Sequence, residues 1–401
     1  MGAGIAQVAA VCGCSVRLID VNSEILDRAM TGIRERFERS VDKGRKSAEE
    51  CKQAMGRVTA SSKIADLADI ELAIEAVVEN PAVKGEVFQQ LERVASTDAV
   101  FATNTSSLRV SDIALTTRDA GRVVGMHFFN PAPIMPLVEI IAGRDSREEA
   151  LTRATEAARA WGKTPVRVKD SPGFIVNRVA RGFYLEALRL FDEGVADIAA
   201  IDEAMRTLGR FRMGPFQLMD LVGLDVNYAV STSVWEQFGK PARLKPHDVQ
   251  CSLVEQGKLG RKTGSGFYRY ESDPPVVNVD GEERLFCLSD DLSAVVESFV
   301  RGAMLCGPAD YESVHARQRY AFARILTTVM NEAALTLQEA VASAEDIDTA
   351  MKLGTNYPEG PLTWAGRVGH STVGRLLHCM NEETADGRFS PAAVFAMPPS
   401  A

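Results

Sequence analysis

Residues 2–20, GAGIAQVAAVCGCSVRLID, decide the fold class of this 401-residue chain. Residues 2–13 are small and apolar, which suits a helix that packs closely against its neighbours. Residues 15–20 form an apolar run that predicts a buried strand ending on an acid. A small-residue helix followed by such a strand is typical of the second half of a dinucleotide-binding β-α-β unit.

Asp20 and Gly2 carry the chemistry of this segment. An acid at this strand end accepts hydrogen bonds from adenosine ribose hydroxyls and repels the extra phosphate of NADP, so Asp20 favours NAD. An aspartate in an ordinary strand-to-helix turn explains the same residues. The full fingerprint has a strand and G-x-G-x-x-G here, and only its third glycine is present, as Gly2. We therefore expect the first strand and its phosphate cradle to be missing, with Met1 an internal methionine or the sequence a fragment.

Strand-like and helix-like segments alternate along the first 170 residues. Asn22 is placed to cap a helix whose apolar residues recur at helical spacing through Phe37. Further helices are expected at 83–94 and 147–161, and strands at 70–78, 99–102, 123–129, 137–141 and 165–168. This alternation predicts an α/β sheet domain over residues 1–170.

After residue 170 the sequence changes to long amphipathic helices that contain an internal repeat. Each repeated pair is 146 positions apart (347 − 201 = 146), and Glu186-Ala187 matches Glu332-Ala333 at the same separation. The other matched residues are Glu193, Val195, Ile201, Asp202, Ala204, Met205, Gly214 and Pro215 in the first copy, and Glu339, Val341, Ile347, Asp348, Ala350, Met351, Gly360 and Pro361 in the second. We expect two helical domains, 171–270 and 313–397, joined by a polar linker at 271–312.

Composition and charge argue against several classes of function. Apolar residues make up 46% and charged residues 25% of the chain, the balance of a globular protein. The net charge of -9 gives no basic face for nucleic acid or an acidic membrane. The seven cysteines lack the spacings of zinc sites, and no run is long and apolar enough for a membrane-spanning helix. We therefore expect a cytoplasmic protein without a metal ion.

Residues 127–139, HFFNPAPIMPLVE, carry the strongest indication of catalysis. His127 ends one strand, the chain turns through three prolines, and a second strand carries Glu139. Such a hairpin can bring Glu139 beside the imidazole and fix its tautomer. An oriented imidazole can remove the proton of a hydroxyl group. A structural role is the alternative for any one histidine, but the other four have no comparable setting.

Four further stretches leave their role open. TNTSS at 103–107 follows a short strand and forms either a ligand-binding loop or a solvated turn. Asn177, at the start of the helical half, faces either the sheet or solvent. GRKTG at 260–264 lacks the Gly-Lys pair of an ATP-binding P-loop, and either contacts a dinucleotide phosphate or is solvated. The basic helix end at 36–46 is either a solvated face or a contact for the 3′-phosphate of CoA.

Together these segments resemble the 3-hydroxyacyl-CoA dehydrogenase family over almost the whole chain, from Gly2 to about Phe395. In chain order, the motifs that carry the resemblance are Asp20, EAVVEN at 75–80, NTSS at 104–107, the 127–139 hairpin, SPGF at 171–174 with Asn177, and GRKTG at 260–264. The resemblance implies a Rossmann-type NAD-binding domain followed by two helical domains similar to the C-terminal domain of 6-phosphogluconate dehydrogenase.

The resemblance also implies residue roles. His127 would be the general base in oxidation, Glu139 would orient it, and Ser106 and Asn177 would hold the substrate's 3-oxygen. The residues implied to contact NAD are Gly2, Asp20, Glu79, Lys84, Ser106, Asn130 and Lys262. Lys43 would lie near the CoA phosphate.

The implied activity is NAD-dependent oxidation of (S)-3-hydroxyacyl-CoA to 3-oxoacyl-CoA, as in β-oxidation. The duplicated helical unit is similar to long bacterial members, among them dehydrogenases of phenylacetate catabolism that act on 3-hydroxyadipyl-CoA or 3-hydroxybutyryl-CoA. In single-copy members the helical domain mediates dimerisation, so a homodimer is expected, although two copies in one chain could instead pack on each other. The alternatives are a dehydrogenase of another β-hydroxy acid and an inactive chain that serves binding or assembly.

Overall fold

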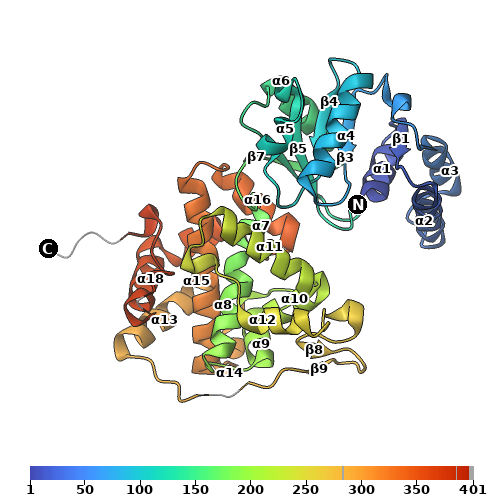
Figure 1. Ribbon diagram of the computed structural model, residues 1–401. Coiled ribbons are helices and arrows are strands. Elements are labelled where there is room, and N and C mark those ends of the chain that lie inside the picture. Colours follow the sequence, from blue (N-terminus) through green and yellow to red (C-terminus); the bar gives the residue numbers. More distant parts are fainter. Residues whose placement is uncertain (282–283, 385, 397–401) are drawn as a thin grey trace. The chain divides into compact units, whose positions relative to one another are not determined.

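The computed structural model describes residues 1–281, 284–384 and 386–396 and divides into two compact units. Unit 1 is Met1–Phe174 and unit 2 is Ile175–Ala401. The division lies four residues beyond the end expected for the α/β domain, and both helical copies lie within unit 2. Figure 1 colours the two units along the chain, from blue to red.

Unit 1 alternates helices and strands. Its helices are α1 (Gly2–Val11), α2 (Ser23–Asp42), α3 (Ala48–Gly56), α4 (Pro81–Val94), α5 (Val110–Ala114) and α6 (Glu148–Ala160). Its strands are β1 (Val16–Ile19), β2 (Val58–Ser61), β3 (Leu72–Glu75), β4 (Val100–Thr103), β5 (Val123–Phe128), β6 (Leu137–Ala142) and β7 (Thr164–Lys169). Asn22 accepts hydrogen bonds from the first turn of α2, so the predicted cap is confirmed.

The strands of unit 1 form two sheets. β1 and β2 pair in parallel, and a second sheet has the order β3-β4-β5-β6-β7, with β6 antiparallel to β5 and parallel to β7. Among the described residues no strand joins β1 to β3, so the sheet is divided at the place that the first strand of a dinucleotide-binding unit takes. α1 packs on both parts, because Ile5 belongs to the core of the five-stranded sheet and Ala6 and Ala10 to the core beside β2.

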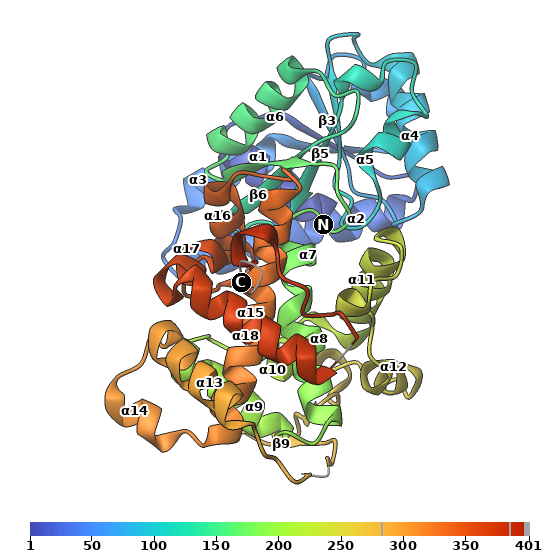
Figure 2. The same cartoon turned by 90° about the vertical axis from the view of Figure 1, so that its left-hand side faces the viewer.

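Unit 2 is helical apart from a short hairpin of β8 (Tyr268–Arg269) and β9 (Val276–Val277). Its helices are α7 (Val176–Val179), α8 (Arg181–Asp192), α9 (Ile198–Gly209), α10 (Pro215–Val222), α11 (Leu224–Gln237), α12 (Asp248–Glu255), α13 (Asp290–Ala303), α14 (Pro308–Ser313), α15 (Ala316–Gln338), α16 (Ala344–Thr355), α17 (Pro361–Val368) and α18 (His370–Thr384). The long helix α15 packs along α8 (Figures 1 and 2). No described helix has the length and apolar character needed to cross a membrane.

The segment 271–312, expected to be a polar linker, contains α13 and α14. α13 buries Leu292, Val296 and Phe299, which recur at helical spacing. The expectation was wrong here because acidic and polar residues separate these apolar positions. Burial of one face makes α13 part of the core of unit 2.

Candidate active site

The hairpin of β5 and β6 places His127 and Glu139 directly opposite each other. The imidazole Nδ1 lies 2.6 Å from Oε2 of Glu139. Both side chains are buried, Glu139 completely. A contact this short between an imidazole and a buried carboxylate is a charge-assisted hydrogen bond that fixes the ring. With Nδ1 engaged, Nε2 is the nitrogen that can exchange a proton with a ligand.

Aromatic rings and a lysine hold the hairpin in shape. The rings of Phe129 and Phe174 lie 4.6 and 5.7 Å from the imidazole, between centroids. Lys163 donates to the carbonyl oxygens of Ala132 and Met135 at 2.6 and 2.9 Å, across the turn. The turn that separates the two catalytic candidates is therefore supported from β7's side as well as by its own prolines.

Asn104 anchors the residue that follows His127. β4 ends at Thr103 while β5 continues to Phe128, so backbone groups at the end of β5 need another partner. Oδ1 of Asn104 accepts from Phe128 N at 2.8 Å, and the backbone N–H of Asn104 donates to Glu75 O at 2.8 Å. Asn104 thus joins the ends of three strands beside the imidazole, a function that the sequence motif did not predict.

Glu79 organises the loop that carries Ser106. Its Oε1 accepts from the backbone N–H groups of Ser106 and Ser107 at 3.0 and 3.1 Å, and from Thr105 Oγ1 at 2.5 Å. Burial acts to raise the pKa of Glu79. The hydrogen bond from Thr105 and the charge of Lys84 lower this pKa by more than burial raises it, so the net shift is downward. A carboxylate that stays ionised keeps this loop in one conformation.

Lys84 is fully buried between two carboxylates. Its Nζ lies 2.8 Å from Oε1 of Glu75 and 3.2 Å from Oε2 of Glu79. Glu75 also accepts from Thr103 Oγ1 at 2.7 Å. A buried ammonium needs such partners, because an unpaired charge in the interior is costly. The predicted contact of Lys84 with NAD stays a prediction, and the structure shows a connection from Lys84 to the Ser106 loop through Glu79.

Four other predicted residues of unit 1 lie at ends of secondary structure. Asp20 follows β1, is half-buried, and accepts from Asn22 N at 3.0 Å. Gly2 begins α1, Lys43 is exposed at the end of α2, and Asn130 is exposed at the start of the hairpin turn. β3 and β4 end on the polar residues Glu75 and Thr103, and Asp20 follows β1, the arrangement expected where an α/β sheet binds a ligand.

Asn177 and Lys262 belong to unit 2. Asn177 lies on α7, is half-buried, and its carbonyl accepts from Arg181 Nε at 2.8 Å. Lys262 pairs with Asp225 through two contacts of 2.6 Å. Their predicted contacts with substrate and NAD stay predictions. Among the described residues, no group of three or more histidine, cysteine or acidic side chains could hold a metal ion.

Comparison with known proteins identifies the family. Residues 1–171 match the family described as "3-hydroxyacyl-CoA dehydrogenase, NAD binding domain", and residues 173–270 and 320–397 match "3-hydroxyacyl-CoA dehydrogenase, C-terminal domain". The chain belongs to the 3-hydroxyacyl-CoA dehydrogenase family. The predicted fold class, a Rossmann-like NAD-binding domain followed by a helical part, is confirmed, and so is NAD as the cofactor of this type of domain.

Relatives of this dehydrogenase-family chain span both units. The 3-hydroxyadipyl-CoA dehydrogenase of Escherichia coli is 36% identical, over 98% of this chain and 94% of that protein. The crystal structure of an E. coli 3-hydroxybutyryl-CoA dehydrogenase matches with a TM-score of 0.86 at 35% identity, covering 98% and 95% of the two chains. The (S)-3-hydroxybutyryl-CoA dehydrogenase of Ralstonia eutropha matches 68% of this chain and 96% of its own, with a TM-score of 0.65 at 34% identity.

Proposed function

We propose that this protein oxidises the 3-hydroxyl group of an (S)-3-hydroxyacyl-CoA to a ketone, with NAD as the acceptor. The observation that carries the proposal is the contact of 2.6 Å between His127 Nδ1 and the buried carboxylate of Glu139. Such a pair supplies a base of fixed orientation, which the oxidation of an alcohol requires. The family membership supports the same reaction class.

In this mechanism His127 removes the hydroxyl proton through Nε2. Bound NAD would supply the acceptor for the hydride that leaves C3 of the substrate. As the imidazole becomes positively charged, the adjacent carboxylate of Glu139 stabilises it without moving, so the favourable interaction is stronger in the transition state than in the ground state. In the reverse direction the imidazolium returns the proton to the 3-oxygen.

We assign the remaining contacts of the 3-oxygen to Ser106 and Asn177. A hydroxyl and an amide are suitable donors for an oxygen on which negative charge develops. Glu79 supports the first of them, because it holds the backbone of the Ser106 loop at 3.0 Å. Lys84 acts on the same loop indirectly, through its contact with Glu79.

The residues at the strand ends fit NAD. Asp20 offers a half-buried carboxylate to ribose hydroxyls at the end of β1. Val21, Val77 and Val78 follow β1 and β3 and leave apolar surface exposed, 94%, 42% and 67% respectively, which the flat rings of a dinucleotide can cover. We assign Gly2, Asn130 and Lys262 to further contacts with the cofactor.

We propose a short-chain or dicarboxylic acyl-CoA as the substrate, in phenylacetate catabolism. The support is the similarity over both units to proteins named 3-hydroxyadipyl-CoA and 3-hydroxybutyryl-CoA dehydrogenase. Lys43, exposed at the end of α2, is assigned to the CoA phosphate, where a cation is favourable.

The test is the absorbance of NADH during reduction of acetoacetyl-CoA and oxidation of 3-hydroxybutyryl-CoA and 3-hydroxyadipyl-CoA. His127→Ala should abolish turnover without changing the far-ultraviolet circular dichroism. Free 3-hydroxybutyrate, which lacks CoA, separates this activity from that of other β-hydroxy acid dehydrogenases. Equal turnover of the free acid, or a folded and fully active His127→Ala, would contradict the proposal.

A further inference from the structure

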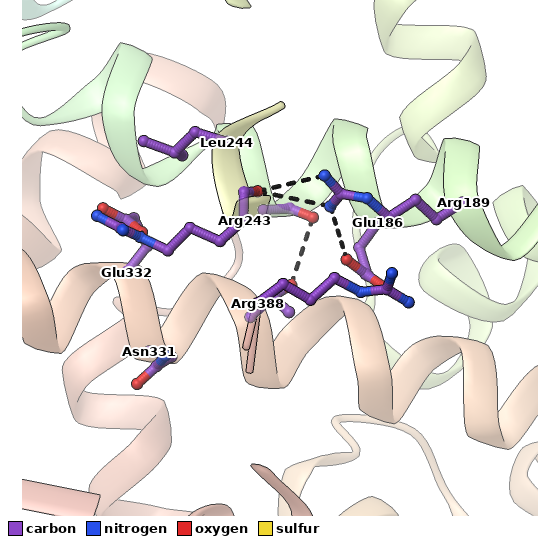
Figure 3. A pocket seen from close by; sticks show the side chains of 9 residues that line it. Glu186, Arg189, Arg243, Leu244, Asn331, Glu332 and Arg388 are labelled. Carbon is purple, nitrogen blue, oxygen red and sulfur yellow. Dashed lines mark hydrogen bonds and ion pairs between the residues drawn. The ribbon is translucent and has the colours of Figure 1, made fainter. Parts of the chain in front are cut away.

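The buried arginines that the structure describes in unit 2 are paired with glutamates, with one exception. Arg178 donates to Glu332 at 2.7 Å, and Arg324 donates to Glu186 at 2.6 Å. Figure 3 shows the two glutamates around a cavity of about 20 Å³ that is also lined by Arg189, Arg243 and Arg388. A cavity of this size holds one water molecule. These charges therefore balance one another and leave no room for a ligand.

Arg181, at the start of α8, is the exception. It is 3% exposed, and no carboxylate of the described residues forms an ion pair with it. Its Nε donates to the backbone carbonyl of Asn177 at 2.8 Å, and Nη1 donates to the carbonyl of Asn227 at 3.2 Å and to Ser231 Oγ at 2.8 Å. The other terminal nitrogen, Nη2, donates to no atom in the part of the chain that the structure describes. Burial without a counter-ion lowers the pKa of Arg181.

The groups around Arg181 are polar but uncharged. The ring centroid of Tyr184 lies 5.0 Å from the guanidinium carbon. Tyr357 is 4% exposed, and its hydroxyl oxygen has no hydrogen-bond partner among the described residues. Burial raises the pKa of Tyr357 while the charge of Arg181 acts to lower it, so the two groups lie close enough to interact. A buried guanidinium and a buried hydroxyl that both have hydrogen-bonding capacity left suit an anion.

The internal repeat shows that a helical unit of this kind folds without the charge. The residues at the corresponding positions, 146 apart, are Thr327 for Arg181, Val373 for Asn227, Leu377 for Ser231 and Phe211 for Tyr357. All four counterparts are buried, and none carries a charge. Asn177, which is assigned to the 3-oxygen of the substrate, has Ala323 as its counterpart (323 − 177 = 146). The buried charge beside Asn177 is therefore not repeated beside Ala323, and it accompanies the residue assigned to the substrate.

The guanidinium of Arg181 lies one helical turn from Asn177. Side chains on a helix tilt toward its N-terminus, so a residue at i+4 lies over residue i, and the bond from Arg181 Nε to Asn177 O is such a contact. Four helical residues rise by about 6 Å. In a six-carbon chain with a carboxyl group at each end, the far carboxyl carbon is three bonds of about 1.5 Å from C3. A carboxylate at the far end of a short acyl chain can therefore reach Arg181 while the 3-oxygen is held at Asn177.

We propose that Arg181 binds the terminal carboxylate of a dicarboxylic acyl-CoA and so makes the protein select substrates whose acyl chain ends in a charge. This assignment rests on the proposed oxidation of a 3-hydroxyacyl-CoA and names the residue that selects among its substrates. Nη2 donates to the carboxylate, and the hydroxyl of Tyr357 is a second donor. The carboxylate supplies the counter-ion that the guanidinium lacks, and the pair offsets the cost of burying it. A chain that ends in a methyl group leaves the guanidinium unpaired, which opposes binding of that substrate.

The test compares 3-hydroxyadipyl-CoA with 3-hydroxyhexanoyl-CoA, which have acyl chains of six carbons and differ in a terminal carboxylate or methyl group. The ratio of the two kcat/KM values, measured through NADH, should favour the dicarboxylic substrate by about 10²-fold or more in the wild type. Arg181→Met, which is uncharged and of similar length, should lower this ratio by about 10²-fold. Arg181→Lys keeps a charge without the planar fork and should keep part of the preference. Arg206→Met, on an exposed pair with Glu203, is the control that should leave the ratio unchanged.

Thermal unfolding without substrate separates a binding role of Arg181 from a structural one. Arg181→Met should unfold at the wild-type temperature or above it, because it removes a buried charge that has no counter-ion. A variant that unfolds at a lower temperature and loses both substrates in equal measure would assign Arg181 to the fold and overturn the proposal. If Arg181→Met does not fold, Tyr357→Phe gives the same comparison, since it removes only the second donor and should lower the ratio by about tenfold.

The two substrates also distinguish this proposal from the proposed function. A wild type that oxidises both equally well, or an Arg181→Met whose ratio stays within about threefold of the wild type, would overturn the role of Arg181 and leave the dehydrogenase activity standing. Oxidation of neither substrate would contradict the proposed function itself, and the role of Arg181 with it.

Discussion

Replacing Glu139 by Gln should lower kcat by between about 10²- and 10³-fold and leave the fold intact. Glu139 is completely buried and 2.6 Å from Nδ1 of His127. Two opposite unit charges about 4 Å apart attract by about 4 kcal/mol at the effective dielectric constant of about 20 that describes protein sites. Each 1.4 kcal/mol corresponds to about tenfold in rate, so complete loss of this attraction gives about 10³-fold. The imidazole is only partly charged in the transition state, so part of this attraction is lost and the lower limit of the expected decrease in kcat is about 10²-fold.

The assay is the initial rate of acetoacetyl-CoA reduction, followed through NADH, over a range of substrate concentrations. KM should change little, because Glu139 acts on His127 and has no assigned contact with the substrate. Glu148→Gln is the matched control, since that carboxylate is exposed and pairs with Arg167 on the surface. A folded Glu139→Gln that keeps more than about a third of the wild-type kcat would show that the buried charge does not stabilise the imidazolium.

The other predictions concern groups that support the fold. Asn104→Leu leaves the N–H of Phe128 without its acceptor and should cost about 1–3 kcal/mol of stability and about tenfold in kcat. Asn104→Asp keeps an acceptor and should lose less of each. Thermal unfolding measures the stability of the two variants, and initial rates measure their kcat. Burial raises the pKa of Asp202 from 3.8 to about 7. Between these pH values the carboxyl group keeps its proton in the folded chain and has lost it in the unfolded chain. The free energy of unfolding should therefore fall by about 1.4 kcal/mol per pH unit as the pH rises from 4 to 7. In urea unfolding, this fall in the free energy of unfolding should be absent in Asp202→Asn. It should still be present in Asp348→Asn, which changes the counterpart residue in the second copy. Burial also acts to raise the pKa of Glu186, but neighbouring arginines lower it from 4.5 to about 2. Glu186→Gln should therefore lower the free energy of unfolding by on the order of 3 kcal/mol at pH 7, and this difference should vanish as the pH falls from 4.5 toward 2. A variant as stable as the wild type at pH 7 would contradict the assignment.

Periodic patterns predicted the fold because they reflect burial over many residues. The strands that became β4 to β7 are apolar runs, and the helix after Asn22 has both a cap and a buried stripe. β2 was not predicted, since Val58–Ser61 has only one buried residue, Val58, and owes its strand form to pairing with β1.

The contact between His127 and Glu139 could be predicted because both residues lie on one hairpin, twelve positions apart, where the register of two strands brings them together. The support of this pair could not be predicted in the same way. Asn104 acts on a backbone N–H that every residue but proline possesses, so no residue type marks it. Lys163 likewise binds two carbonyl oxygens, far along the chain from the turn that it holds.

Two carboxylates, the buried Glu139 and the partly exposed Glu79, contact two different parts of the site. Glu139 binds the imidazole itself, while Glu79 binds the backbone of the Ser106 loop and is ionised beside Lys84. A change at Lys84 should act on the Ser106 loop through Glu79, whereas a change at Glu139 acts on the imidazole directly. In the proposed mechanism, proton transfer thus depends on the buried charge of Glu139, and stabilisation of the 3-oxygen depends on the contact of Glu79 with the Ser106 loop.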